Sequence, residues 1–338
     1  MSKGDLEGRI EDFVGNQHVV DFLRLSFGQE SLAPAYLFEG PARVGKYRLA
    51  KRLAQLMLCQ SPGAGSLQAC GTCSGCQQFL ASVHPDFYEL RRLIDDKTGL
   101  SAQRIGIDQI RQLQERLHLH SFLNGHKLAI IDEVEHLSIE AANALLKIVE
   151  EPPARTILLL VCADSGRLPG TLQSRCQRLL FRLVPRTEIA EFLQWHEVKP
   201  AAAQRLAATV YGRPGLALEL AQLTHGFDEQ QQRYRSVLQL CGQTLYQRLR
   251  RVDELLKDFS PEQLCSQLTR VFRDLLLTWT GNQERLGNPS LTVELAVQAQ
   301  KLSPRQLSSV LRELGQVRGQ LSANVNPKLL FENIMLTF

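Results

Sequence analysis

Residues 40–46 of the 338-residue chain read GPARVGK and have the spacing of a phosphate-binding loop. Gly40, Gly45 and Lys46 match the pattern G-x-x-x-x-G-K, in which backbone N–H groups and the lysine hold phosphate oxygens. The next residue of such a loop is Ser or Thr, whose hydroxyl binds Mg²⁺. Here it is Tyr47, so the sequence predicts a phosphate-binding loop that lacks its metal-binding hydroxyl.

Two carboxylates follow an apolar run within LAIIDEVEHL, residues 128–137. In nucleotide-hydrolysing enzymes with such a loop, one carboxylate after a strand binds Mg²⁺ and its neighbour can polarise the attacking water. Asp132 and Glu133 stand at those places, although an acidic turn after a strand is also common. Because the loop precedes them in the chain, we favour the nucleotide-type interpretation.

Four cysteines lie close together in CQSPGAGSLQACGTCSGC, residues 59–76. Cys59, Cys70, Cys73 and Cys76 include two C-x-x-C steps, a pattern typical of a closed tetrahedral Zn²⁺ site. Since protein thiolates would fill every coordination position, we expect the Zn²⁺ to be structural rather than catalytic; the alternative is a set of unrelated free thiols. The remaining cysteines are scattered and are expected to be small buried residues: Cys162, Cys176, Cys241 and Cys265.

One arginine, Arg175, comes just before an apolar run within LQSRCQRL, residues 172–179. A guanidinium at such a place can bind a phosphate or pair with a carboxylate. Taken by itself, it is an ordinary surface charge.

The composition is that of an ordinary soluble globular protein, with 44% hydrophobic and 22% charged residues. The net charge of +4 is too small to indicate nucleic-acid binding. The longest apolar run, residues 156–163, is far below the roughly 20 residues that span a bilayer. The charged N-terminal sequence lacks the apolar stretch of a signal peptide, so we expect a cytoplasmic protein with no membrane partner.

The elements that must position these residues alternate along the first half of the chain. Apolar runs predict buried strands, and apolar residues at helical spacing predict helices between them. This rhythm indicates an α/β fold with a parallel sheet and covering helices. The predicted strands are residues 35–40, 127–134, 155–163 and 179–184, and the predicted helices are 107–119 and 138–151.

Beyond about residue 184 only helical patterns follow. Three short helices, at 185–198, 201–212 and 214–223, predict a small lid. Longer amphipathic helices fill the rest of the chain. We therefore expect three domains: an α/β domain over 1–184 with the cysteine insert at 59–76, a helical lid over 185–225 and a helical domain over 226–338.

Taken in order, these segments resemble the clamp-loader branch of the AAA+ family, with a close match to its delta-prime-type subunits. The resemblance covers nearly the whole chain, and its most specific parts are NALLKIVEEPP, the cysteine spacing and SRC. It implies a P-loop-type sheet domain with a zinc module, a three-helix lid and a helical collar. The other pieces that carry it are residues 13–23, 35–46, 84–90, 105–113, 127–153 and 324–336.

Departures from the family pattern separate this chain from the ATP-hydrolysing gamma/tau motor subunits. Besides Tyr47, the polar sensor residue after the third strand falls near Cys162 and Ala163, neither a good γ-phosphate donor. The sensor arginine of the lid falls on Gly215, with Arg213 displaced by two positions. The loop is thus expected to keep its shape, with ATP binding weak or absent and no ATPase activity of the chain alone.

The resemblance gives Arg175 a role as an arginine finger, which enters the ATP site of a neighbouring subunit and stabilises the γ-phosphate in the transition state. It implies a non-motor subunit of the DNA polymerase III clamp loader, which assembles with gamma/tau and delta subunits and places the sliding clamp on primed DNA. The alternative is a motor subunit of the gamma/tau type.

Direct DNA contact is a separate question. A zinc-ribbon DNA-binding protein is rejected, because residues 61–79 contain no Lys or Arg. Arg104 and Arg111, around a predicted helix N-terminus, are candidate phosphate contacts, although solvent-exposed helix charges explain them equally well.

Overall fold

The computed structural model describes residues 13–29, 31–62, 68–92, 104–119, 121, 125–223, 226–321 and 325–338. The chain divides into two compact units. The first comprises Met1–Phe192 with Gly212–Gly215, and the second comprises Leu193–Tyr211 with Leu216–Phe338. Every helix in the described parts is too short or too polar to cross a membrane.

A five-stranded parallel sheet forms the centre of the first unit, in the order β2-β3-β4-β1-β5. All residues of β3 and β4 are buried, as expected for strands covered on both faces. The strands are β1 (Ala35–Glu39), β2 (Phe87–Leu90), β3 (Lys127–Ile131), β4 (Thr156–Cys162) and β5 (Gln177–Leu180).

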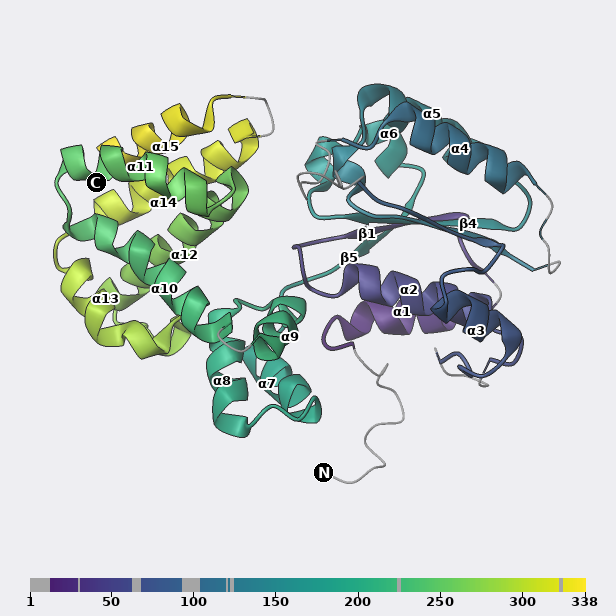
Figure 1. Cartoon of the computed structure of the whole chain (residues 1–338), viewed down its shortest axis with the longest axis horizontal. Coiled ribbons are helices and arrows are strands. Elements are labelled where there is room, and N and C mark those ends of the chain that lie inside the picture. The colour runs from purple at the N-terminus through teal and green to yellow at the C-terminus, as the bar shows by residue number, and fades with distance from the viewer. Residues whose placement is uncertain are drawn as a thin grey trace. The chain divides into compact units, whose positions relative to one another are not determined.

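Helices cover both faces of this sheet, with α1, α2 and α3 on one side and α4, α5 and α6 on the other (Figure 1). Side chains of a strand alternate between the two layers. Accordingly Tyr36 and Phe38 pack with the first set, and Ala35 and Leu37 with the second. The bounds are α1 (Gln17–Gly28), α2 (Lys46–Met57), α3 (Ser74–Leu80), α4 (Ile107–His118), α5 (Ile139–Glu150) and α6 (Gly170–Gln173), with short 3-10 helices η2 (Val134–His136) and η3 (Ser165–Arg167).

The α/β class is confirmed, and three predicted strands correspond to β1, β3 and β4. The predicted strand 127–134 is too long, since β3 ends at Ile131 and the 3-10 helix η2 begins at Val134. The fourth predicted strand, 179–184, corresponds to β5 at residues 177–180. This edge strand is set by its pairing with β1, and the apolar run did not mark its bounds. β2 was not predicted.

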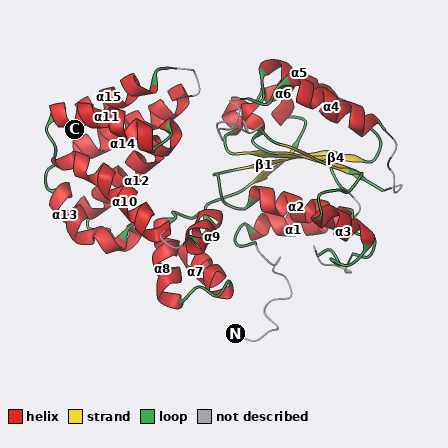
Figure 2. Ribbon diagram, viewed as in Figure 1, coloured by secondary structure: helices red, strands yellow, loops and turns green. Residues whose placement is uncertain are grey.

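In its described residues, the second unit consists of helices joined by loops and contains no strand (Figure 2). Its apolar core surrounds α12, from which Leu268, Val271 and Phe272 are fully buried. α7 (Arg186–Trp195) and α9 (Pro214–Gln222) each have residues in both units, and the predicted three-domain division stays a prediction. The other bounds are α8 (Pro200–Thr209), α10 (Gly226–Leu238), η4 (Gln239–Gly242), α11 (Leu245–Asp258), α12 (Pro261–Trp279), η5 (Gln283–Arg285), η6 (Pro289–Leu291), α13 (Thr292–Ala299), α14 (Pro304–Gln320) and α15 (Pro327–Leu336).

Candidate functional site

The predicted phosphate loop joins β1 to α2, and its two glycines are required by the backbone. Gly40 has φ 145°, and a Cβ there would lie 2.3 Å from the carbonyl oxygen of Phe181. Gly45 has φ 103°, and a Cβ would lie 2.9 Å from the ring of Phe13. Only glycine tolerates both the positive φ and the close neighbours. The sequence motif thus occupies the strand–turn–helix setting that such a loop needs.

The ammonium of Lys46 is turned back into this loop. Its Nζ donates to the carbonyl oxygens of Gly40 at 2.6 Å and Pro41 at 2.7 Å, and the residue is only 5% exposed. Burial lowers the pKa of Lys46 to about 8, with the charge of Arg213 acting in the same direction and Glu135 opposing it. In a working site, the ammonium of this lysine would bind phosphate. Here it donates to carbonyl groups of the loop itself.

Residues 212–215 contact the loop through the backbone of Gly215. The N–H of Gly215 donates to the carbonyl oxygen of Arg43 at 3.0 Å, and a Cβ on Gly215 would lie 3.0 Å from that oxygen. A side chain at Gly215 would crowd this contact. At the predicted sensor position, the chain therefore offers a glycine whose N–H is hydrogen-bonded to the loop.

Tyr47 is held at the edge strand β2. Its hydroxyl donates to Glu89 Oε1 at 2.8 Å, and the guanidinium of Arg91 lies 4.0 Å from the ring centroid. Burial and the hydrogen bond to Glu89 raise the pKa of Tyr47. Lys51 Nζ and Arg91 both pair with the same Glu89 carboxylate, the former at 2.9 Å. The phenol therefore belongs to a polar cluster that the sequence analysis missed, since β2 was not recognised.

The two predicted carboxylates follow β3 and have different surroundings. Arg92 binds Glu133 with both its Nε and Nη2, at 2.6 and 2.7 Å. Burial acting alone would raise the pKa of Glu133, but these charge-assisted bonds lower it. Burial raises the pKa of Asp132, whose Oδ1 accepts from the N–H of Glu133 at 3.0 Å. Glu133 is therefore already paired within the chain, by an arginine that no motif had singled out.

The predicted sensor position at the end of β4 is apolar in character. Cys162 is fully buried, and burial raises the pKa of its thiol. The N–H of Ala163 donates to Glu135 Oε1 at 2.9 Å, which brings a third carboxylate to this edge of the sheet. Ala163 has no donor side chain, and the thiol of Cys162 is only a weak donor.

Arg175 lies on the surface, just after the short helix α6. Its Nη2 is 2.9 Å from Glu150 Oε1, and its Nη1 donates to the carbonyl oxygen of Thr171 at 3.1 Å. The side chains of Arg175 and Glu150 are 42% and 40% exposed. This guanidinium is accessible and is held by an exposed ion pair, which is a weak restraint in water.

The four insert cysteines converge on one point, and they could hold a metal ion. All their Sγ atoms lie within 4.8 Å of one another, with the Cys70–Cys76 and Cys73–Cys59 pairs 3.9 Å apart. Tetrahedral Zn²⁺ with bonds of about 2.3 Å places sulfurs about 3.8 Å apart. Backbone N–H groups of Cys70, Cys73 and Cys76 also point at sulfurs, at 3.3 to 3.4 Å. The donor set and its spacing fit Zn²⁺.

The remaining predicted residues are found on surfaces or in the interior. Arg104 and Arg111 are exposed at and near the start of α4, and Arg111 lies 3.7 Å from the carboxylate of Asp108. Of the scattered cysteines, three are buried and Cys176 is half-buried.

Comparisons with known proteins agree along the chain. A sequence model described as "DNA polymerase III, delta subunit" matches residues 15–185, and one described as "DNA polymerase III, delta subunit, C terminal" matches residues 228–338. DNA polymerase III subunit delta' of Pseudomonas aeruginosa is 30% identical, over 91% of this chain and 92% of that protein. Subunit delta' of Escherichia coli is 33% identical, over 89% and 87% respectively.

Proteins named as tau or gamma subunits also match the chain. DNA polymerase III subunit tau of Bacillus subtilis is 26% identical over 96% of this chain but only 60% of its own length. A solved gamma-subunit-related protein of Thermotoga maritima is 19% identical, covers 94% of this chain and 97% of its own, and has a TM-score of 0.42. Given the family models and the delta' relatives, the chain belongs to the delta-prime family of DNA polymerase III clamp-loader subunits.

Proposed function

We propose that the chain is a non-motor clamp-loader subunit, which does not hydrolyse ATP itself and supplies Arg175 to the ATP site of a neighbouring subunit. Its partners are the gamma/tau motor subunits and the delta subunit, and together they place the sliding clamp on primed DNA in the cytoplasm. The observation that carries the proposal is the contrast between a loop whose lysine is bound inward and an arginine that is exposed.

Four features of the chain's own candidate nucleotide site support the absence of hydrolysis. Lys46 is bound to loop carbonyls, Tyr47 to Glu89, and Glu133 to Arg92, while Cys162 offers no good donor. Catalysis of phosphoryl transfer depends almost entirely on charge placed around the γ-phosphate and Mg²⁺. With those groups engaged elsewhere, the loop retains at most weak nucleotide binding through its backbone N–H groups.

The exposure of Arg175 supports its action in trans. An arginine finger must project from the surface of its own subunit and bind phosphate oxygens of the ATP held by another subunit. The ion pair with Glu150 is exposed and costs little to exchange for a γ-phosphate, which carries more negative charge. Such an arginine raises the rate of hydrolysis by roughly 10³ to 10⁵.

We also propose that Cys59, Cys70, Cys73 and Cys76 bind structural Zn²⁺. When bound, the metal would cross-link the end of α2 to α3, and with four thiolate ligands it offers no position for a substrate. Cys73 caps α3 through its side chain, which accepts from the N–H of Cys76. The metal's contribution is therefore to the folding of this insert.

The experiment that tests the non-motor assignment is Mg²⁺-ATP binding and turnover by the purified chain alone, with Lys46→Ala as the matched control. We expect no turnover above that of Lys46→Ala and weak or absent binding. Turnover that Lys46→Ala abolishes would identify a gamma/tau-type motor and overturn the proposal. Co-expression with motor and delta subunits tests assembly separately, and failure to co-purify would contradict the clamp-loader role.

A further inference from the structure

The segment that carries Arg175 has little support of its own. α6 is four residues long, about one helical turn, and an isolated turn is unstable in water. The direct partners of the guanidinium are a main-chain oxygen in α6 itself and the exposed carboxylate of Glu150. The placement of this segment must therefore come from other contacts with the sheet domain.

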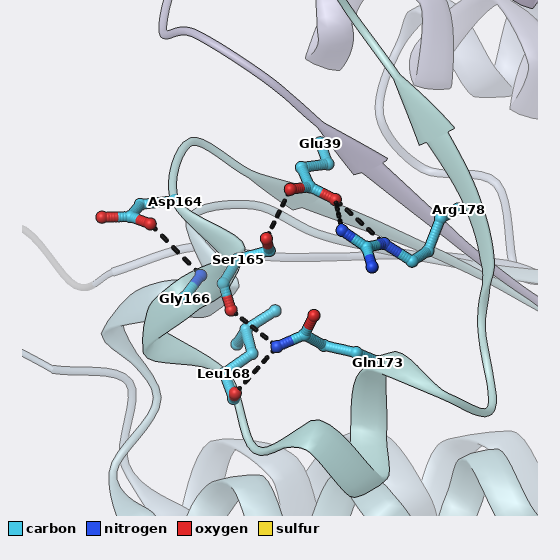
Figure 3. Close-up of polar contacts among 7 residues, drawn as sticks. All are labelled: Glu39, Asp164, Ser165, Gly166, Leu168, Gln173 and Arg178. Carbon is cyan, nitrogen blue, oxygen red and sulfur yellow. Dashed lines mark hydrogen bonds and ion pairs between the residues drawn. The ribbon is translucent and has the colours of Figure 1, made fainter.

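One such contact is made by Gln173, the last residue of α6. Its Nε2 donates to the carbonyl oxygens of Ser165 at 2.8 Å and Leu168 at 3.0 Å (Figure 3). These oxygens belong to the turn that follows β4, where Gly166 N–H in turn donates to Asp164 Oδ1 at 3.2 Å. A single side-chain amide thus fastens α6 to the turn at the end of the central strand.

The second contact lies on the other side of Arg175. Arg178, on β5, donates to Glu39 Oε2 from Nε at 3.0 Å and from Nη2 at 2.6 Å, and the hydroxyl of Ser165 donates to the other oxygen of the same carboxylate (Figure 3). The Glu39 side chain is 15% exposed. Burial alone would raise the pKa of Glu39, but the bonds from Ser165 and Arg178 lower it, so the carboxylate is charged at neutral pH.

These contacts form one connected set, which we name the Glu39 network: Glu39, Ser165, Gln173 and Arg178. Gln173 and Arg178 lie two residues before and three residues after Arg175. Both lead to Ser165, in η3 after β4, and to Glu39, the last residue of β1 and immediately before Gly40. The arginine segment is therefore held from both sides at the rigid carboxyl edge of the sheet.

We propose that Gln173 and Arg178 are positioning residues for Arg175, which they hold at the place from which it reaches the neighbour's γ-phosphate. This inference rests on the proposed function in trans. Transition-state stabilisation demands tight geometry, and a misplacement of about 1 Å can cost roughly 10²-fold in rate. Loosening either side of the segment lowers the rate through Arg175 and not through the chain's folding or assembly.

The test uses an assembled complex in which only the motor subunit next to this chain can hydrolyse ATP. It measures hydrolysis with Gln173→Met and Arg178→Met chains, each also combined with Arg175→Ala. Methionine keeps the length of the Gln173 side chain and removes its donors; at position 178 it keeps an unbranched apolar side chain and removes the guanidinium. Gln177→Met, at an exposed residue of β5, is the matched control for Gln173→Met, because it carries the same change outside the Glu39 network. Melting temperature and co-purification are recorded for every chain.

We expect kcat to fall by roughly 10-fold to 10²-fold in Gln173→Met, with KM for ATP little changed. In the Arg175→Ala background, the same substitution should cause no further loss, since its effect acts through the missing arginine. Arg178→Lys, which keeps a charge on Glu39, should recover part of the loss of Arg178→Met. Gln177→Met should match the parent.

Equal fold losses in the parent and Arg175→Ala backgrounds would overturn the inference, because the network would then act independently of Arg175. Parental kcat in both methionine variants would overturn it as well. If Arg175→Ala alone leaves hydrolysis unchanged, the proposed function in trans is itself wrong. The two failures can be told apart. If only the positioning role of the Glu39 network is wrong, Arg175→Ala is defective and the methionine variants are not.

Discussion

The Nζ of Lys46 lies 2.6 Å from the carbonyl oxygen of Gly40, so the first and last residues of the phosphate loop motif are bonded to each other. In this contact, the ammonium that the motif would offer to a phosphate is hydrogen-bonded to the loop's own backbone. It closes the turn that joins β1 to α2. An intact loop motif is therefore compatible with the proposed absence of hydrolysis.

The stability contributed by Lys46 should depend on pH. Its pKa of about 8 lies below the ordinary value of 10.5, so between those values the unfolded chain binds more protons and stability rises with pH. Relative to Lys46→Met, which does not titrate, the parent should gain about 2 kcal/mol between about pH 7 and about pH 9.5. Urea denaturation followed by circular dichroism measures this difference. A constant difference across that range would contradict a buried ammonium.

Restoring a hydroxyl at position 47 should not restore hydrolysis. Tyr47→Thr supplies the group that normally binds Mg²⁺, but Lys46 and Glu133 are still engaged by Gly40 and Arg92. We expect Mg²⁺-ATP turnover to stay at the level of the parent, with lower stability from the lost bond to Glu89. Tyr47→Phe, which keeps the ring against Arg91, isolates that bond and should cost about 1 kcal/mol. Turnover in Tyr47→Thr would show that the hydroxyl was the only missing part.

The sequence predicted the buried half of the fold better than its edges. β3 and β4 are apolar at nearly every position because both faces are covered, so their patterns are continuous runs. β2 has three partly exposed or exposed residues out of four and gave no such run. Strands of this kind are set by pairing with a neighbour that lies far along the chain, which no local pattern records.

The candidate site divides in the same way. Gly40, Lys46 and the four cysteines were found because the spacing of their motifs is local. The partners of Tyr47 and Glu133 were not, since Glu89 lies on β2 and Arg92 just after that strand. These polar contacts join residues 42 and 41 positions apart, and no local sequence pattern predicts such a contact before the strand order is known.

Removal of one insert thiol should release the metal. Cys70→Ser leaves three thiolates and a weak hydroxyl ligand, so we expect the purified chain to lose stoichiometric Zn²⁺, measured by elemental mass spectrometry. Cys176→Ser, a half-buried thiol outside the cluster, should retain it. Full Zn²⁺ content in Cys70→Ser would contradict a four-thiolate site.

Direct DNA contact by the start of α4 should appear in the salt dependence of binding. For the assembled complex on primed DNA, Arg104→Ala combined with Arg111→Ala should make the slope of log K against log salt shallower, by roughly 0.9 per lost phosphate contact. Arg312→Ala, an exposed arginine on α14, is the control and should leave the slope unchanged. Equal slopes for the double variant and the parent would remove Arg104 and Arg111 from the interface.

The most direct test of the account is the hydrolysis rate in a complex where only the motor subunit next to this chain can hydrolyse ATP. Arg175→Ala should lower that rate by roughly 10³-fold or more. Arg175→Lys should be nearly as defective, because an ammonium lacks the guanidinium fork. Lys46→Ala in this chain should have little effect. A parental rate with Arg175→Ala, or a large loss with Lys46→Ala, would contradict a subunit that serves its neighbour's ATP site and not its own.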